Sequence, residues 1–255
     1  MQDDRLSAVT HSAITVLKDQ KETEIVMKKN EYSRKVLASV VVLTMVGFGG
    51  LAVAGDETAA QAGEKTGIEG QFVRVAENDE GWVVLGYTTA NGSVNEKWML
   101  LDIGLTLQNG VKDQKITRDQ IKLVTPSDQV ISMATQEEYM SGHATLDAMN
   151  ARANIESQSI NYFPNGRTRP CRIGFFGNMD QRVGNLSFDE VTVDDRSACL
   201  GRVYFQIPDG IQLGQYNFDV QFAGSIVRVP FKIMTKEEAK AFDQEWKQEE
   251  KKEKH

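Results

Sequence analysis

An alternation of apolar and polar residues with a period of two runs through residues 71–234 and predicts β-strands. In residues 97–108 every odd position from 99 to 107 is apolar, while the even positions become polar toward the end. Such a period keeps one face of a strand in a core along its whole length. Residues 215–222 and 226–233 show the same pattern. Their inward positions are predicted to be Tyr216, Phe218, Val220 and Phe222, followed by Val227, Val229, Phe231 and Ile233.

Turn residues divide this region into roughly eight or nine short strands, which is typical of an antiparallel sandwich or barrel. Asn91-Gly92 predicts a hairpin-type turn, because both residues tolerate positive φ. Asn109-Gly110 and Pro208-Asp209-Gly210 end two further strands. Pro230 lacks an amide hydrogen, so we expect the last strand to lie at the edge of a sheet.

Two segments have helical spacing instead. In Thr135–Ser157, apolar residues recur at intervals of three and four, and Gly142 indicates a break in the helix. Thr235–His255 is a charged segment with Phe242 and Trp246 on one face. A capping box, in which a threonine is followed three residues later by glutamate, starts each segment. We therefore expect one inserted helix and one charged C-terminal helix.

The N-terminal part contains an uncharged apolar run at residues 36–54, preceded by basic residues and followed by acidic ones. This asymmetry keeps the basic end in the cytoplasm. Ala52-Val53-Ala54 matches the small-residue pattern of a cleavage site. If translation starts at Met27, residues 27–55 are a cleaved signal peptide. If it starts at Met1, a membrane anchor fits better.

The chain is accordingly divided into five parts. Residues 1–26 are an over-long gene start or a cytoplasmic tail, and residues 27–55 are the signal peptide or anchor. Residues 56–70 are small and polar and predict a linker. Residues 71–234 form the β domain and residues 235–255 the helical tail. The predicted location is outside the cytoplasm, periplasmic or extracellular, with membrane contact only through residues 36–54 if they are retained.

Composition and cysteines refine this picture. The net charge of -7 disfavours a general nucleic-acid binder, which needs a basic face to neutralise phosphates. Cys171 and Cys199 both fall in the exported part, where an oxidising compartment permits a disulfide. Two buried thiols are the alternative, since free cysteine packs as a small apolar residue. No cofactor is expected.

Residues 98–233 resemble bacterial exported immunoglobulin-like domains of uncharacterised function. The resemblance rests on a long strand ending in Asn-Gly, on residues 119–123 (DQIKL) and on residues 201–208 (GRVYFQIP), followed by a final hairpin. It implies an antiparallel immunoglobulin-like β-sandwich that serves as an accessory or binding module, and it implies no catalytic residue. The helical segment and the cysteine pair depart from that pattern.

The sequence contains few candidates for catalytic or metal-binding residues. Nucleophilic catalysis needs an activated side chain beside a base, and the predicted β domain contains one histidine, His143, which is expected on a helix surface. The densest acidic patch consists of Asp189, Glu190, Asp194 and Asp195. It is either a solvated acidic loop or, as the less favoured alternative, a Ca²⁺ site made of oxygen ligands.

Interaction surfaces are better candidates. Tyr162 and Phe163 precede Arg167 and Arg169, and Phe175-Phe176 follow; the aromatic residues either pack in the core or, where exposed, form a binding patch with the arginines. Phe242 and Trp246 are expected to dock on their own domain or, alternatively, on a partner.

We therefore predict an exported, non-enzymatic module that binds an unknown protein or other envelope or extracellular component. The alternatives are a membrane-anchored structural or assembly protein and, less favoured, a Ca²⁺-dependent carbohydrate-active protein.

Overall fold

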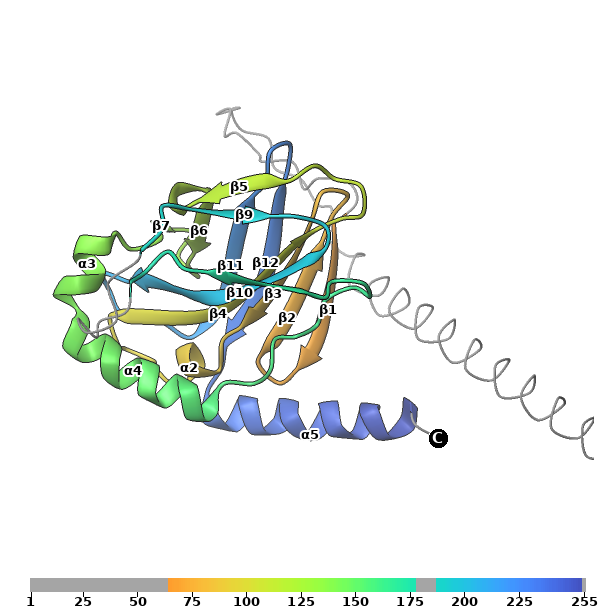
Figure 1. Cartoon of the computed structure of the whole chain (residues 1–255). Helices are drawn as coiled ribbons and strands as arrows, with labels where there is room; N and C mark the ends of the chain where they lie inside the picture. Colours follow the sequence, from red (N-terminus) through yellow and green to blue (C-terminus); the bar gives the residue numbers. More distant parts are fainter. Residues whose placement is uncertain (1–63, 178–186, 254–255) are drawn as a thin grey trace, which may run out of the picture. The chain divides into compact units, whose positions relative to one another are not determined.

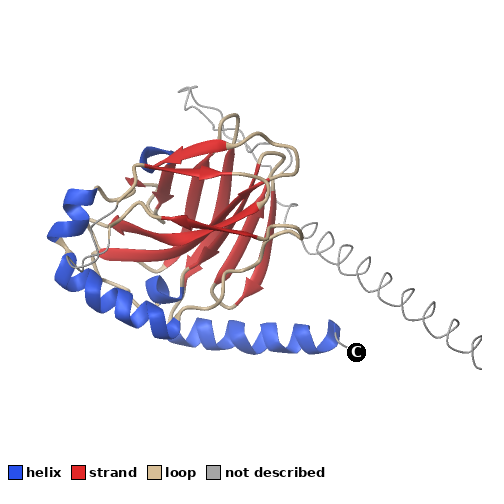
Figure 2. Cartoon of the chain, in the orientation of Figure 1, coloured by secondary structure: helices blue, strands red, loops and turns tan. Residues whose placement is uncertain are grey.

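Strands make up most of the regular structure of the protein (Figure 2). The computed structural model describes residues 64–177 and 187–253, with side chains up to residue 248. Its two larger sheets have six strands in the order β1-β2-β3-β4-β10-β8 and four strands in the order β12-β11-β6-β7. Strands β5 and β9 pair separately as a ribbon. The prediction of a mainly β fold is confirmed.

The six-stranded sheet is antiparallel from β1 to β10, whereas β8 pairs with β10 in parallel. The predicted antiparallel pattern therefore holds for every described strand pair except this one. The sheet consists of β1 (Lys65–Gly70), β2 (Val73–Glu77), β3 (Gly81–Gly86), β4 (Trp98–Leu107), β10 (Ser197–Gln206) and β8 (Arg169–Ile173).

The four-stranded sheet carries the two cleanest alternating segments of the sequence. Strand β12 lies at its edge, as Pro230 predicted. The sheet consists of β6 (Ile121–Val124), β7 (Val130–Ser132), β11 (Gly214–Gln221) and β12 (Ile226–Ile233). The separate ribbon consists of β5 (Gln114–Thr117) and β9 (Glu190–Val193).

One hydrophobic core joins the two larger sheets. The odd positions of β4 from 99 to 107 are fully buried, as are Phe218 and Val220 on β11. Across the sheets, the rings of Phe205 and Phe218 lie edge to face with centroids 6.2 Å apart, an arrangement that aromatic quadrupoles favour. The period of two therefore identified the inward faces correctly.

The described residues also contain four helices and a short 3-10 helix, η1 (Arg118–Gln120). The helices are α2 (Thr88–Asn91), α3 (Gln136–Ser141), α4 (His143–Glu156) and α5 (Lys236–Glu253) (Figure 1). Gly142 separates α3 from α4, as predicted. Both capping boxes form: the Glu138 amide donates to Thr135 Oγ1 over 3.1 Å, and the Glu238 amide to Thr235 Oγ1 over 3.2 Å.

Three local expectations were wrong. Residues 65–70, expected in the linker, form β1, because they complete a hairpin with β2. Asn91 is not at a hairpin turn: it ends α2, and its side chain accepts a hydrogen bond from the Met234 amide (2.7 Å). Residues 160–163 lie in the region 71–234 that was expected to form strands, but they form none, since they cross a sheet face where no strand edge is available for pairing.

Residues 157–168, which we call the strap, lie across the outer face of the six-stranded sheet, between α4 and β8 (Figure 1). Ile160 and Phe163 pack on a small apolar cluster formed by Val73, Val75 and Val84. Trp82 Nε1 donates to the Tyr162 carbonyl over 2.9 Å, and the Phe72 amide donates to Gln158 Oε1 over 3.1 Å.

Two side chains next to the first strands, Glu64 before β1 and Asn78 after β2, contact the free edge of β12. The Arg228 amide donates to Glu64 Oε1, and Asn78 Nδ2 donates to Ser225 Oγ (2.9 Å) and to the Ile226 carbonyl (3.3 Å). Pro230 contributes no donor. Exposed backbone groups on an edge strand are templates for pairing with another chain, and here several of them are already satisfied.

The described residues contain no helix that is long and apolar enough to cross a membrane. The predicted signal peptide or anchor at residues 27–55 lies outside these residues, as does most of the predicted linker.

Candidate binding surface

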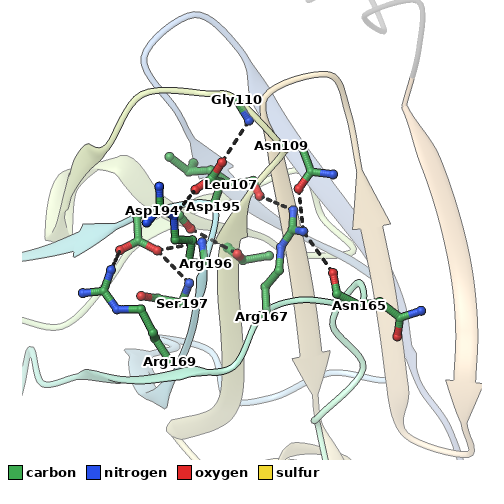
Figure 3. A network of polar contacts seen from close by, with 11 residues as sticks. Leu107, Asn109, Gly110, Asn165, Arg167, Arg169, Asp194, Asp195, Arg196 and Ser197 are labelled. Atoms are coloured by element: carbon green, nitrogen blue, oxygen red, sulfur yellow. Dashed lines mark hydrogen bonds and ion pairs between the residues drawn. The ribbon is translucent and has the colours of Figure 1, made fainter.

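Predicted arginine and acidic residues meet at one end of β4 and β10 (Figure 3). Arg167 Nη2 donates to the Leu107 carbonyl over 2.8 Å, and its Nη1 donates to Asn109 Oδ1 over 2.7 Å. Arg169 forms an ion pair with Asp194, with 3.3 Å between Nη1 and Oδ2. Arg167 thus contacts the end of β4, and Arg169, the first residue of β8, contacts the turn between β9 and β10.

Asp194 shapes that turn. Its Oδ1 accepts hydrogen bonds from the amides of Arg196 (2.8 Å) and Ser197 (2.6 Å). Burial alone would raise the pKa of this carboxyl, but these hydrogen bonds and the Arg169 guanidinium outweigh it, so the pKa lies below its usual range. Asp195 accepts a hydrogen bond from the Gly110 amide over 2.9 Å. Both carboxylates therefore stabilise turns.

The other two acidic candidates lie apart from this network. Glu190 is on β9, not in a loop, and pairs with Lys115 across the ribbon at 2.6 Å; Asp189 lies 3.8 Å from Arg118. In the described parts of the chain, no group of three or more His, Cys, Asp or Glu side chains is arranged to hold a metal ion. The four acidic residues thus do not form a common Ca²⁺ cage.

Beside the arginines lies a part of the outer sheet face that neither α4 nor the strap buries completely. The sheet register places Gly104, Leu200 and Arg172 side by side on β4, β10 and β8. A Cβ atom at Gly104 would lie 2.7 Å from Phe163 Cζ and 3.3 Å from Leu200 Cδ2, so both side chains meet over this glycine. Leu200 is 36% exposed and Arg172 is exposed.

The aromatic residues of the region divide into two groups. Phe175 and Phe176 are buried, and the Arg118 guanidinium lies over the Phe176 ring at 4.6 Å. Tyr162, by contrast, is 37% exposed, and Phe163 is partly buried. Hence Phe175 and Phe176 belong to the core, whereas Tyr162 lies at the surface.

We call the set Tyr162, Phe163, Arg167, Arg172 and Leu200 the binding surface. The sequence patterns did not identify Arg172 and Leu200 as members of this set. The signal for Leu200 was present: on β10 the inward residues are Cys199, Val203 and Phe205, so an apolar residue at position 200 must face outward. The alternation did not indicate that Arg172 lies beside Leu200, because this position results from the parallel pairing of β8 with β10.

The two cysteines form a disulfide between neighbouring positions of β8 and β10. Cys199 is buried and Cys171 is partly exposed, and both sulfurs face the Thr192 carbonyl of β9. The predicted pairing is therefore present, and it fastens the edge strand that carries Arg169 and Arg172.

The C-terminal helix uses its apolar face on its own domain. Gln71 Nε2 donates to the Ala239 carbonyl over 2.7 Å, and the Arg74 guanidinium lies between the rings of Tyr87 (5.1 Å) and Phe242 (5.3 Å). Desolvation lowers the pKa of Arg74. Trp246, one turn further along, is partly exposed.

Comparison with known proteins gives no relative: no family model, curated protein or solved structure matches the chain.

Proposed function

We propose that the protein is an exported, non-enzymatic binding module, built as an immunoglobulin-like β-sandwich, that recognises an envelope or extracellular partner through the binding surface. The observation that carries this proposal is the combination of exposed Tyr162 and Leu200 with arginines on one sheet face. Interface hot spots are enriched in tyrosine and arginine.

Export is supported by the Cys171–Cys199 disulfide, because disulfides persist in oxidising compartments and are rare in the cytosol. It is also supported by the apolar run and the small-residue triplet at 52–54. The intact mass of the protein from the envelope and medium of its host, with and without reductant, tests both points. A mass that begins near Gly55 is expected. A mass that retains residues 36–54 would instead favour the membrane-anchored assembly protein.

Binding is tested by placing a photo-crosslinking amino acid at position 162 of the full-length protein in its host. A specific adduct is expected, because the Tyr162 side chain is exposed and directly precedes Phe163, which meets Leu200 over Gly104. Val130, which is 60% exposed on β7 of the other sheet, provides the control position. The absence of an adduct at 162, or the same adducts at 162 and 130, would contradict the proposal.

A further inference from the structure

The binding surface carries two arginine charges that no carboxylate of residues 64–177 and 187–248 pairs with. The chain as a whole is acidic, with a net charge of -7, yet residues 157–179 contain three arginines and no acidic residue. Arg169 is paired with Asp194. Arg167 has only neutral acceptors, and no carboxylate of the described residues pairs with Arg172.

Arg167 is also held in a defined position. Its two terminal nitrogens donate to the Leu107 carbonyl and to Asn109 Oδ1, and the residue is partly buried. Arg172 stands on β8, which the disulfide fastens to β10. A guanidinium that is fixed before binding loses less conformational entropy when it meets a ligand. The Arg167 guanidinium and the strand that carries Arg172 are therefore held in place before an anion binds.

Apolar contact area lies beside these charges. Leu200 is the neighbour of Arg172 across the sheet, and Phe163 meets Leu200 over Gly104. Phe188, which is 55% exposed, packs over Gly174 directly after β8. A ligand that offered only anionic groups would leave these apolar side chains uncovered.

We infer that the binding surface takes an acidic polypeptide segment whose carboxylates are interspersed with apolar side chains. This inference rests on the proposed function and specifies its partner. Arginine presents a planar fork that matches a carboxylate with two parallel hydrogen bonds. Leucine-sized side chains of the same segment cover Leu200 and Phe188. An anionic polysaccharide satisfies the arginines but presents hydroxyl groups to the apolar residues.

The test uses the oxidised full-length protein and fluorescently labelled probes, with binding followed by anisotropy. The probes are a peptide of glutamates interspersed with leucines, the same peptide with lysine in place of glutamate, and polygalacturonate. We expect the glutamate–leucine peptide to bind most tightly and to weaken as salt is raised. Arg172→Glu should weaken its binding roughly tenfold or more, because it places like charges face to face.

Lys240→Glu is the matched control: it reverses the same charge at an exposed position of α5 and should leave binding within about twofold of the native protein, since separate sites act independently. Equal binding of the lysine peptide, unchanged binding by Arg172→Glu, or tighter binding of polygalacturonate would each overturn the inference. If the adduct at position 162 then persists in Arg172→Glu, the proposed function stands and only the acidic nature of the partner is rejected.

Discussion

Single polar side chains join the loops of the two larger sheets, and Glu80 makes the most such contacts among the described residues. Its carboxylate accepts hydrogen bonds from Ser225 Oγ (2.6 Å), the Gly224 amide (3.0 Å) and Gln114 Nε2 (2.6 Å). It therefore ties the β2–β3 turn to the β11–β12 turn and to β5. Burial alone would raise the pKa of Glu80, but these hydrogen bonds outweigh it, and the pKa lies below its ordinary value of 4.5.

Glu80→Gln should lower the free energy of unfolding near neutral pH by about 1 kcal/mol, since an amide replaces a charged acceptor. The folded pKa is below the unfolded one, so the carboxylate stabilises the fold fully above 4.5 and loses this effect as the pH falls through the folded value. The difference between variant and native protein should shrink in acid. Urea unfolding at several pH values measures it, and a difference that grows in acid would contradict the assignment.

Such contacts mark the limit of what the sequence predicts at this scale. The alternation in residues 215–222 was sufficient to identify Phe218 and Val220 as core residues. The partners of Glu80 lie 34 to 145 residues away in the chain, so no local pattern contains them. The same holds for Arg169 and Asp194: the sequence named both residues, but only the fold shows that they form a pair.

At the scale of elements, the strap depends on two glycines. A Cβ atom at Gly104 would lie 2.7 Å from Phe163, and one at Gly86 would lie 2.7 Å from Ile160. The missing side chains allow the strap to rest directly on the sheet. Its backbone finds no strand to pair with, so side-chain packing and a few hydrogen bonds hold it in place.

Gly104→Val should displace Phe163 and destabilise the protein by about 1–3 kcal/mol, as expected for overpacking. Because Trp82 donates to Tyr162, amides of residues 158–165 should exchange faster with solvent and the Trp82 emission should change. Hydrogen exchange followed by mass spectrometry measures the effect. Gly67→Val on β1, where only Glu69 Oε1 lies near at 3.8 Å, is the control and should leave the strap protected.

The disulfide is the second element-scale feature, since it closes a loop with a sequence separation of 28 residues. Replacing both cysteines with alanine should lower the free energy of unfolding by about 3–4 kcal/mol on the chain-entropy model. Thermal unfolding of the double variant, compared with native protein under oxidising and reducing conditions, tests this. A native protein that reduction leaves unchanged in stability would show that the bond does not constrain the fold.

At the scale of the molecule, the free edge of β12 bears on self-association. Glu64 accepts the Arg228 amide hydrogen, and Asn78 donates to the Ile226 carbonyl. The double variant Glu64→Ala with Asn78→Ala frees backbone groups on an exposed edge. We expect it to form oligomers at concentrations where the native protein does not. Analytical ultracentrifugation measures this, with Lys240→Ala on α5 as the control; a variant that sediments like the native protein would contradict the role of the edge.

The architecture itself was partly predictable. Period-two patterns and turn residues indicated a mainly β protein, and Pro230 placed β12 at an edge. The parallel pair of β8 with β10 was not predictable, because the residues that connect the two strands contain β9, which pairs with β5 instead, and no local pattern shows which neighbour β8 takes. The resemblance to immunoglobulin-like domains remains a prediction, as does the export segment, which lies outside the described residues.

The pairing of β4 with β10 also determines the order in which the chain can fold. Asp102 and Arg202 are partners in this register, and their side chains meet at 2.9 Å although 100 residues separate them. Until β10 has been synthesised, the longest apolar strand of the first half has one unpaired side. Such long-range pairing is slow and leaves intermediates prone to aggregate. The export that we propose would prolong this exposure, because a chain that crosses a membrane unfolded leaves residues 98–107 unpaired until the second half arrives; we therefore expect a chaperone or the channel itself to shield them.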